Sequence, residues 1–114
     1  MGLSTHVLDT AHGCPAAGMA YRLCEAGSGQ VLREGVTNAD GRCDGPLLAG
    51  EAFVPGRYEL RFAVADYFRA KGVTLPEPPF LEEVTLAFGV ADATAHYHVP
   101  LLVSPWSYST YRGS

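Results

Sequence analysis

The chain is organised around its last segment, Tyr97-His-Val-Pro-Leu-Leu-Val-Ser-Pro-Trp-Ser-Tyr-Ser-Thr-Tyr-Arg-Gly-Ser114. The first half of this stretch reads as a strand, and alternation sorts its side chains onto two faces. They are His98, Pro100 and Leu102 on one face, and Tyr97, Val99, Leu101 and Val103 on the other. Both faces are apolar apart from one histidine, whereas a strand at the surface shows one polar face. We therefore expect this strand to be covered on both sides, by a second sheet and by another subunit.

The second half of the stretch, after Ser104-Pro105, is rich in aromatic side chains. Alternation gives one face to Ser107, Ser109 and Tyr111, and the other to Trp106, Tyr108 and Thr110. Chain ends fray unless they are tied to the rest of the protein. An aromatic ending of this kind predicts a C-terminal segment that packs against the fold.

Upstream, short alternating segments are separated by residues that favour turns. Strands are expected over 3–9, 19–25, 30–37, 57–64 and 82–88, with a shorter one near 47–48. Asp40-Gly41 predicts a tight turn, because both residues tolerate a positive φ. Asp66 is expected to cap one short helix over 67–71. Many short strands at regular spacing are typical of a sandwich of two sheets.

The composition limits the classes of partner. A chain of 114 residues suffices for one core, so we take 1–114 as a single domain. Its net charge of −4 argues against nucleic acid and anionic membranes, which attract basic surfaces. No apolar run approaches the roughly 20 residues of a membrane span. The start lacks the basic and apolar blocks of a signal peptide, so we expect a cytoplasmic protein. We also expect free thiols at Cys14, Cys24 and Cys43, since their number is odd and their spacing fits no zinc site.

Three histidines lie where alternation makes them conspicuous. His6 sits in the middle of the first strand, where a surface histidine with a hydrogen bond would be unremarkable. That interpretation is weaker for His98, whose strand is otherwise apolar on both faces. His96 shares the face of His98, and such a pair can ligate a metal. No cysteine or carboxylate has a matching spacing, so we expect no metal site.

Two further polar features leave alternatives open. Arg42 follows the Asp-Gly turn and could be an ordinary surface arginine or a clamp for an anion or a carbonyl. Ser107 or Ser109 near a histidine could form a serine triad, although the Gly-x-Ser-x-Gly elbow is missing. On the residues alone, the sequence predicts a covered β-sandwich in which two histidines and an arginine can converge.

Four motifs span nearly the whole chain. They are Leu3-Ser-Thr-His-Val-Leu-Asp-Thr10 with Gly13 and Pro15-Ala16, then Thr37-Asn-Ala-Asp-Gly-Arg42, Gly56-Arg-Tyr-Glu-Leu60, and the end from His96 to Tyr111-Arg-Gly-Ser114. In this order they resemble the signatures of the 5-hydroxyisourate hydrolases, the transthyretin-like enzymes of urate breakdown. The resemblance implies an all-β fold, a transthyretin-like β-sandwich of two four-stranded sheets with one short helix. It also implies a homotetramer, a dimer of dimers, with active sites in the groove between dimers.

The resemblance assigns roles to residues at the motif positions. Catalytic roles fall on His6, Arg42 and His98, and substrate-binding roles on Ser109, Tyr111 and Ser114. The implied reaction is hydrolysis of 5-hydroxyisourate to 2-oxo-4-hydroxy-4-carboxy-5-ureidoimidazoline, with neither a metal nor an organic cofactor. We expect His98 to act as the base and His6 to orient water or substrate, while His96 has no central role. The alternative is a transthyretin-like carrier of a small ligand, which would not be expected to keep this set of residues.

Overall fold

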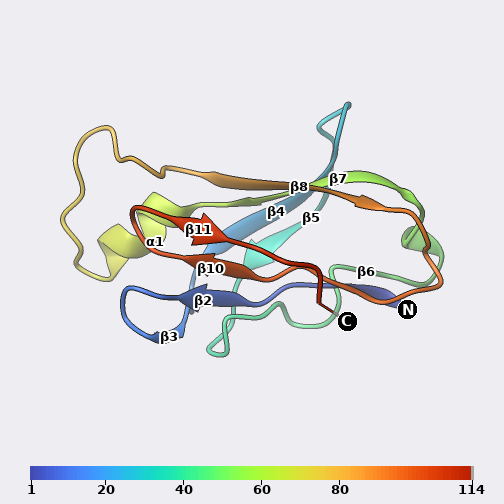
Figure 1. The fold of residues 1–114 in the computed structure, drawn as a ribbon, viewed down its shortest axis with the longest axis horizontal. Coiled ribbons are helices and arrows are strands. Elements are labelled where there is room, and N and C mark those ends of the chain that lie inside the picture. The colour runs from blue at the N-terminus through green and yellow to red at the C-terminus, as the bar shows by residue number, and fades with distance from the viewer. Residues whose placement is uncertain (114) are drawn as a thin grey trace.

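The computed structural model describes residues 1–113 (Figure 1), and Ser114, given a substrate-binding role above, lies outside the described residues. The chain is almost entirely strands and loops, with one short α-helix. In chain order the elements are β1 (Gly2–Ser4), β2 (Val7–Asp9), β3 (Cys14–Pro15), β4 (Ala20–Glu25), β5 (Val31–Val36), β6 (Leu48–Ala49), the 3-10 turn η1 (Gly50–Ala52), β7 (Gly56–Phe62), α1 (Val64–Ala70), β8 (Val84–Val90), β9 (Tyr97–His98), β10 (Leu101–Val103) and β11 (Tyr108–Ser109).

One layer is a regular four-stranded antiparallel sheet with the order β5-β4-β7-β8. Its central strand β7 alternates as the sequence predicts, because Tyr58, Leu60 and Phe62 are buried and face the core. The strand pairs with β8 along its whole length, from Gly56 opposite Val90 to Phe62 opposite Val84. This sheet is the rigid support behind the layer that carries the histidines.

The facing layer is divided into two small sheets, of order β6-β1-β9 and β11-β10-β2-β3. The expectation of two four-stranded sheets was therefore right for the architecture and wrong for the sheet count. β1 and β2 pair in parallel with β9 and β10, and both ladders break at the same level. Two residues explain the break. Pro100 has no amide hydrogen to donate, and the hydroxyl of Thr5 donates to the carbonyl oxygen of Val99 at 2.7 Å.

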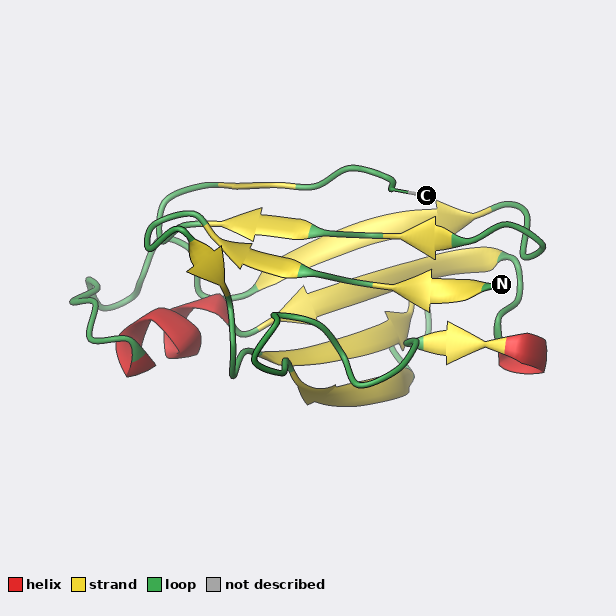
Figure 2. Ribbon diagram, turned by 90° about the horizontal axis from the view of Figure 1, so that it is seen from below, coloured by secondary structure: helices red, strands yellow, loops and turns green. Residues whose placement is uncertain are grey.

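The two layers enclose the core, as Figure 2 shows from the edge. The strand at the C-terminal end has the predicted inner face, since Tyr97, Val99, Leu101 and Val103 are all buried. The outer face of this layer, which includes Ser4, His6, His98 and Leu102, is half-buried. An all-β sandwich with one short helix is thus confirmed, and the histidines lie on its outer face.

The helix differs from its prediction at its start. It begins at Val64, after Ala63, and no side chain caps it, so Asp66 lies inside the first turn. Burial of Val64, Ala65, Tyr67 and Phe68 stabilises this short helix in place of a cap. The helix sits at one end of the molecule, and both ends of the described chain lie toward the other (Figures 1 and 2). Within residues 1–113 no helix is long and apolar enough to cross a membrane. The three cysteines are free, as expected.

Candidate active site

His98 and His6 lie on the outer face of the layer made by β1, β2, β9 and β10. Ser4 in β1 stands directly opposite His98 in β9, and His6 follows Ser4 by two residues. The amide of Leu101 donates to the carbonyl of His6 at 2.9 Å, which keeps the two chain segments parallel past the break in the sheet. Side chains two residues apart in extended chain point to the same face, so Ser4, His6 and His98 are neighbours there.

The C-terminal tail lies against His98. The amide of Gly113 donates to the carbonyl of His98 at 2.7 Å, and the amide of His98 donates to the carbonyl of Gly113 at 3.3 Å. A side chain at position 113 would collide with the ring, because a Cβ there would stand 2.9 Å from Cδ2 of His98. The tail is further held by Arg112, whose guanidinium lies 4.2 Å above the centre of the Tyr97 ring. The predicted packing of the C-terminal segment is confirmed, and it takes place at the candidate site.

Arg42 is positioned by a rigid turn. The side-chain oxygen of Asn38 accepts from the amides of Asp40 and Arg42, at 2.9 and 3.1 Å. Gly41 has a φ of +74°, and a Cβ at this position would overlap the carbonyl oxygen of Val7. The turn therefore requires glycine, and it delivers Arg42 to an isolated antiparallel bridge with His6.

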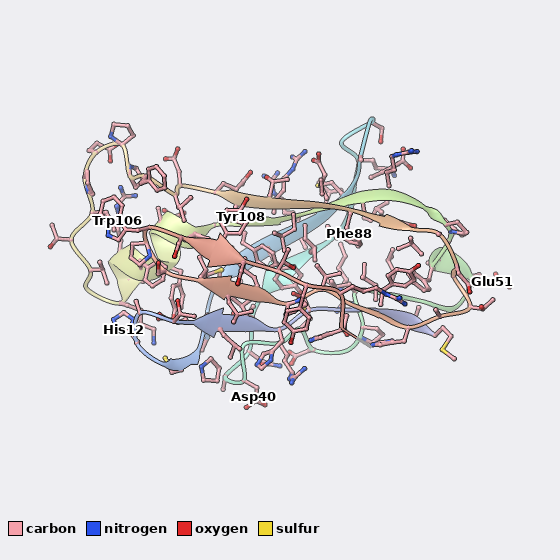
Figure 3. The ribbon with its side chains drawn as sticks, in the orientation of Figure 1. His12, Asp40, Glu51, Phe88, Trp106 and Tyr108 are labelled. Carbon is pink, nitrogen blue, oxygen red and sulfur yellow. The ribbon has the colours of Figure 1, made fainter. Side chains whose placement is uncertain are left out.

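The same turn fixes the tautomer of the His6 ring, that is, which of its nitrogens carries the hydrogen. Nε2 of His6 lies 2.9 Å from the carbonyl oxygen of Asp40, on the loop labelled at the lower edge of Figure 3. A carbonyl oxygen only accepts, so Nε2 carries the hydrogen. In the neutral ring Nδ1 is then left as an acceptor. His6 is thus held by the backbone at one nitrogen and has its second nitrogen available.

His98 is held at the other ring nitrogen, Nδ1, whereas His6 is held at Nε2. Nδ1 of His98 lies 2.9 Å from Oγ of Ser4. Burial lowers the pKa of His98 below its ordinary value of 6.5, and the positive charge of Arg42 and the rings of His6 and His96 lower it further. At neutral pH the ring is therefore uncharged and can accept a proton. His6 and Arg42 form a backbone bridge, and both lower the pKa of His98, so the three residues given catalytic roles lie close together.

Ser109 and Tyr111, which were given substrate-binding roles, lie at two different places. Ser109 pairs with Leu102 across β10 and β11, so it lies on the outer face but remains exposed. Tyr111 is 59% exposed and lines a hollow of about 190 Å³ with Phe88 and Tyr97, between the tail and β8. The serine triad finds no support in the described chain, where the Ser107 hydroxyl bonds that of Ser104 at 3.2 Å.

Sequence reasoning missed Ser4, although alternation alone puts it on the face of His6. Its hydroxyl also lies 3.2 Å from Nε2 of His96, so it touches two histidines. No group of three or more histidine, cysteine, aspartate or glutamate side chains among residues 1–113 is arranged to hold a metal ion. The arrangement is instead that of a neutral base near a cation whose backbone is held by the turn, and such a pair can deprotonate water and stabilise an oxyanion.

Two bacterial relatives of this chain have the same name. The chain is 63% identical over 114 residues to the 5-hydroxyisourate hydrolase of Ralstonia nicotianae, covering 98% of this chain and 97% of that protein. It is 58% identical over 114 residues to the 5-hydroxyisourate hydrolase of Pseudomonas aeruginosa, covering 98% and 90%.

Solved structures agree with this likeness. The 5-hydroxyisourate hydrolase of Klebsiella pneumoniae superposes with a TM-score of 0.83 at 34% identity, over 100% of both chains. Sea bream transthyretin in complex with thyroxine gives 0.85 at 29% identity, over 99% and 95%. An (S)-allantoin synthase gives 0.93 at 47% identity over 99% of this chain, which spans only 43% of that longer one. The family model described as HIUase/Transthyretin matches residues 3–113, and the chain belongs to this family.

Proposed function

We propose that this protein hydrolyses 5-hydroxyisourate to 2-oxo-4-hydroxy-4-carboxy-5-ureidoimidazoline. One water is added: its oxygen bonds a carbonyl carbon of the six-membered ring, and the bond from that carbon to the ring nitrogen breaks. The new carboxyl group keeps the water oxygen, and the released nitrogen takes up a proton. The observation that carries the proposal is the uncharged His98 beside Arg42 and His6, on a chain 63% identical to a hydrolase of that name.

His98 is the proposed base. With Nδ1 engaged by Ser4, Nε2 is the nitrogen left to take a proton from the attacking water. A lowered pKa keeps that nitrogen free of a proton at neutral pH. The same nitrogen then returns the proton to the leaving ring nitrogen, so that the base is restored. A positioned base of this kind contributes about 10²–10⁴-fold in rate.

His6 and Arg42 position the reactants. The free Nδ1 of His6 accepts a hydrogen bond from water or substrate, because its Nε2–H is committed to the carbonyl of Asp40. The guanidinium of Arg42 holds a substrate oxygen and stabilises the negative charge that develops on it during attack. No metal or organic cofactor enters this chemistry.

The remaining predictions concern the pocket and the assembly. We place Ser109, Tyr111 and Ser114 in the substrate-binding set, and propose that residues 1–114 act as one domain. The proposed assembly is a homotetramer, a dimer of dimers whose groove covers the half-buried outer face with His98. Exposed Trp106 and Tyr108 support an assembly, since large aromatic side chains on one surface mark contact sites. Sedimentation tests the tetramer, and cell fractionation tests the expected cytoplasmic location.

One assay distinguishes the hydrolase function from the carrier function. Urate oxidase generates 5-hydroxyisourate from urate, catalase removes the peroxide, and the ultraviolet decay of the product is followed with and without this protein. A large acceleration that survives a chelator supports the hydrolase. A folded protein that binds thyroxine and leaves the decay unchanged would favour the carrier, the activity suggested by the likeness to sea bream transthyretin.

A further inference from the structure

The hydroxyl of Ser4 is shared by two histidine rings that lie on one strand segment. Its oxygen is 2.9 Å from Nδ1 of His98 and 3.2 Å from Nε2 of His96. The three side chains form a continuous line that leads from the half-buried ring of His98 to the exposed ring of His96. The backbone fixes this line, because Ser4 and His98 are register partners in the parallel pairing of β1 with β9.

The Ser4 hydroxyl can bond both rings at once only if it donates to one ring and accepts from the other. It has a single hydrogen to donate, and two lone pairs to accept with. If His98 acts as a base at Nε2, then Nδ1 carries the ring hydrogen and donates it to Ser4. The hydrogen of Ser4 is then directed to Nε2 of His96, which accepts it. This orientation satisfies all three side chains and leaves the reactive nitrogen of His98 free.

We propose that Ser4 is a positioning residue: its hydroxyl, itself oriented by His96, holds the Nδ1–H tautomer of His98 and keeps Nε2 free to act as the base. The inference rests on the proposed hydrolytic function. In each turnover Nε2 of His98 takes a proton from water and passes it to the leaving ring nitrogen, while the hydrogen on Nδ1 stays bonded to Ser4. The ring therefore ends each turnover in the tautomer in which it began.

The groups around His98 disfavour its protonated form. Arg42, on the turn after Asn38, and the rings of His6 and His96 all oppose a positive charge on His98. Arg112 of the tail is near the same segment, since its guanidinium donates to the carbonyl of His96 at 3.2 Å. No carboxylate of the described chain is among the groups that shift the titration of His98. An imidazolium formed during turnover is therefore unstable at this position, and the hydrogen bond to Ser4 fixes which nitrogen keeps its hydrogen when the ring returns to the neutral form.

The kinetic test compares Ser4→Ala with Ser4→Thr, which keeps the hydroxyl and suits a strand. We expect Ser4→Ala to lower kcat about 10- to 100-fold with little change in KM, by analogy with the outer-shell partners of metal-bound histidines. Ser4→Thr should restore most of this loss. His96→Ala should also lower kcat, by less than Ser4→Ala, because the hydroxyl of Ser4 loses the partner that orients it. Wild-type kcat in Ser4→Ala, or equal losses in both Ser4 variants, would overturn the proposal.

A second readout does not depend on turnover. Nitrogen-15 spectra of the histidine rings report which nitrogen of His98 carries hydrogen, and titration reports its pKa. We expect hydrogen on Nδ1 and a lower pKa for His98 in Ser4→Ala, because a hydroxyl that accepts from Nδ1–H stabilises the charged ring. We expect a higher pKa in His96→Ala, because His96 opposes the charge. Hydrogen on Nε2 of His98 in the wild type would overturn the positioning role even if the enzyme is active. Conversely, an inactive protein with these spectra would count against the proposed function alone.

Discussion

His98 and His12 lie in the same layer of the sandwich, yet their surroundings differ completely. His98 bonds a neutral hydroxyl, that of Ser4, and lies near the cationic Arg42. His12 bonds a buried carboxylate, with Nδ1 2.7 Å from Asp9, near the helix end of the molecule (Figure 3). Asp9 also accepts from the hydroxyl of Tyr67 at 2.8 Å and from the amides of Ala11 and His12. The carboxylate is thus fully occupied by groups that hold the fold together.

The difference shows that the partner of a histidine, rather than the histidine itself, separates a structural site from a reactive one. Burial alone would raise the pKa of Asp9, but the hydrogen bonds from His12 and Tyr67 outweigh it and lower the pKa below 3.8. Asp9 is therefore ionised at neutral pH, and the His12 ring that bonds it belongs to a cluster that holds the fold. His98 has the opposite balance, since no carboxylate among residues 1–113 stabilises its charge and its pKa falls.

The largest expected effect is at Arg42. Arg42→Ala should lower kcat about 10²–10³-fold, the usual cost of removing one group that stabilises an oxyanion. The melting temperature should change little, because the Asn38 turn is held by its own side chain and backbone. Arg22→Ala is the matched control, since Arg22 pairs only with exposed Glu83 at 3.3 Å. Equal activity in the two variants would remove Arg42 from the mechanism.

Substitution of Asp9 should lower stability and leave activity nearly unchanged, the reverse of Arg42→Ala. Asp9→Ala leaves the hydroxyl of Tyr67 and two backbone amides without their acceptor, which should cost about 2–4 kcal/mol of unfolding free energy. The folded fraction should keep near wild-type kcat. Chemical denaturation and active-site titration measure the two quantities. A stable Asp9→Ala protein that lacks activity would place the cluster in the catalytic machinery and undo the comparison.

The backbone of Gly113 in the tail is hydrogen-bonded to the backbone of His98. Gly113→Ala should lower kcat about tenfold, because the new Cβ pushes the His98 ring from a geometry in which displacements near 1 Å cost about 10²-fold. Gly89→Ala is the control, as its Cβ would meet only the Gly56 oxygen at 4.0 Å. Steady-state kinetics of both proteins decide the point. Unchanged activity in Gly113→Ala would mean that the tail does not set the position of His98.

The smallest expected effects are those of pH. Since the pKa of His98 is lowered, its base form persists below pH 6.5, and the acid limb of kcat/KM should lie below that value. Arg42 contributes to the lowering, so residual activity in Arg42→Ala should have its acid limb at higher pH. Asp9 affects stability instead: its contribution is present above pH 3.8 and is lost as the pH falls through its lower folded value. An acid limb above pH 6.5 would contradict the uncharged base.

The sequence predicted the parts of the site that depend on local pattern. Alternation found the faces of the strand at 97–103, and Asp40-Gly41 correctly marked the turn before Arg42. Alternation puts Ser4 on the face of His6, but it could not reveal the hydrogen bond of Ser4 to His98, which joins positions 94 apart through a parallel pairing. The break in the outer layer and the uncapped start of the helix escaped for the same reason, since both are decided by tertiary contacts.

The most direct test replaces the two compared histidines in turn. His98→Asn and His12→Asn are measured for their acceleration of 5-hydroxyisourate decay at neutral pH, alongside their melting temperatures. The account predicts that His98→Asn stays folded and loses activity about 10²–10⁴-fold, the contribution of a general base. His12→Asn should lose stability and keep its rate. An active His98→Asn protein would contradict the central claim that the uncharged ring beside Ser4 and Arg42 performs the chemistry.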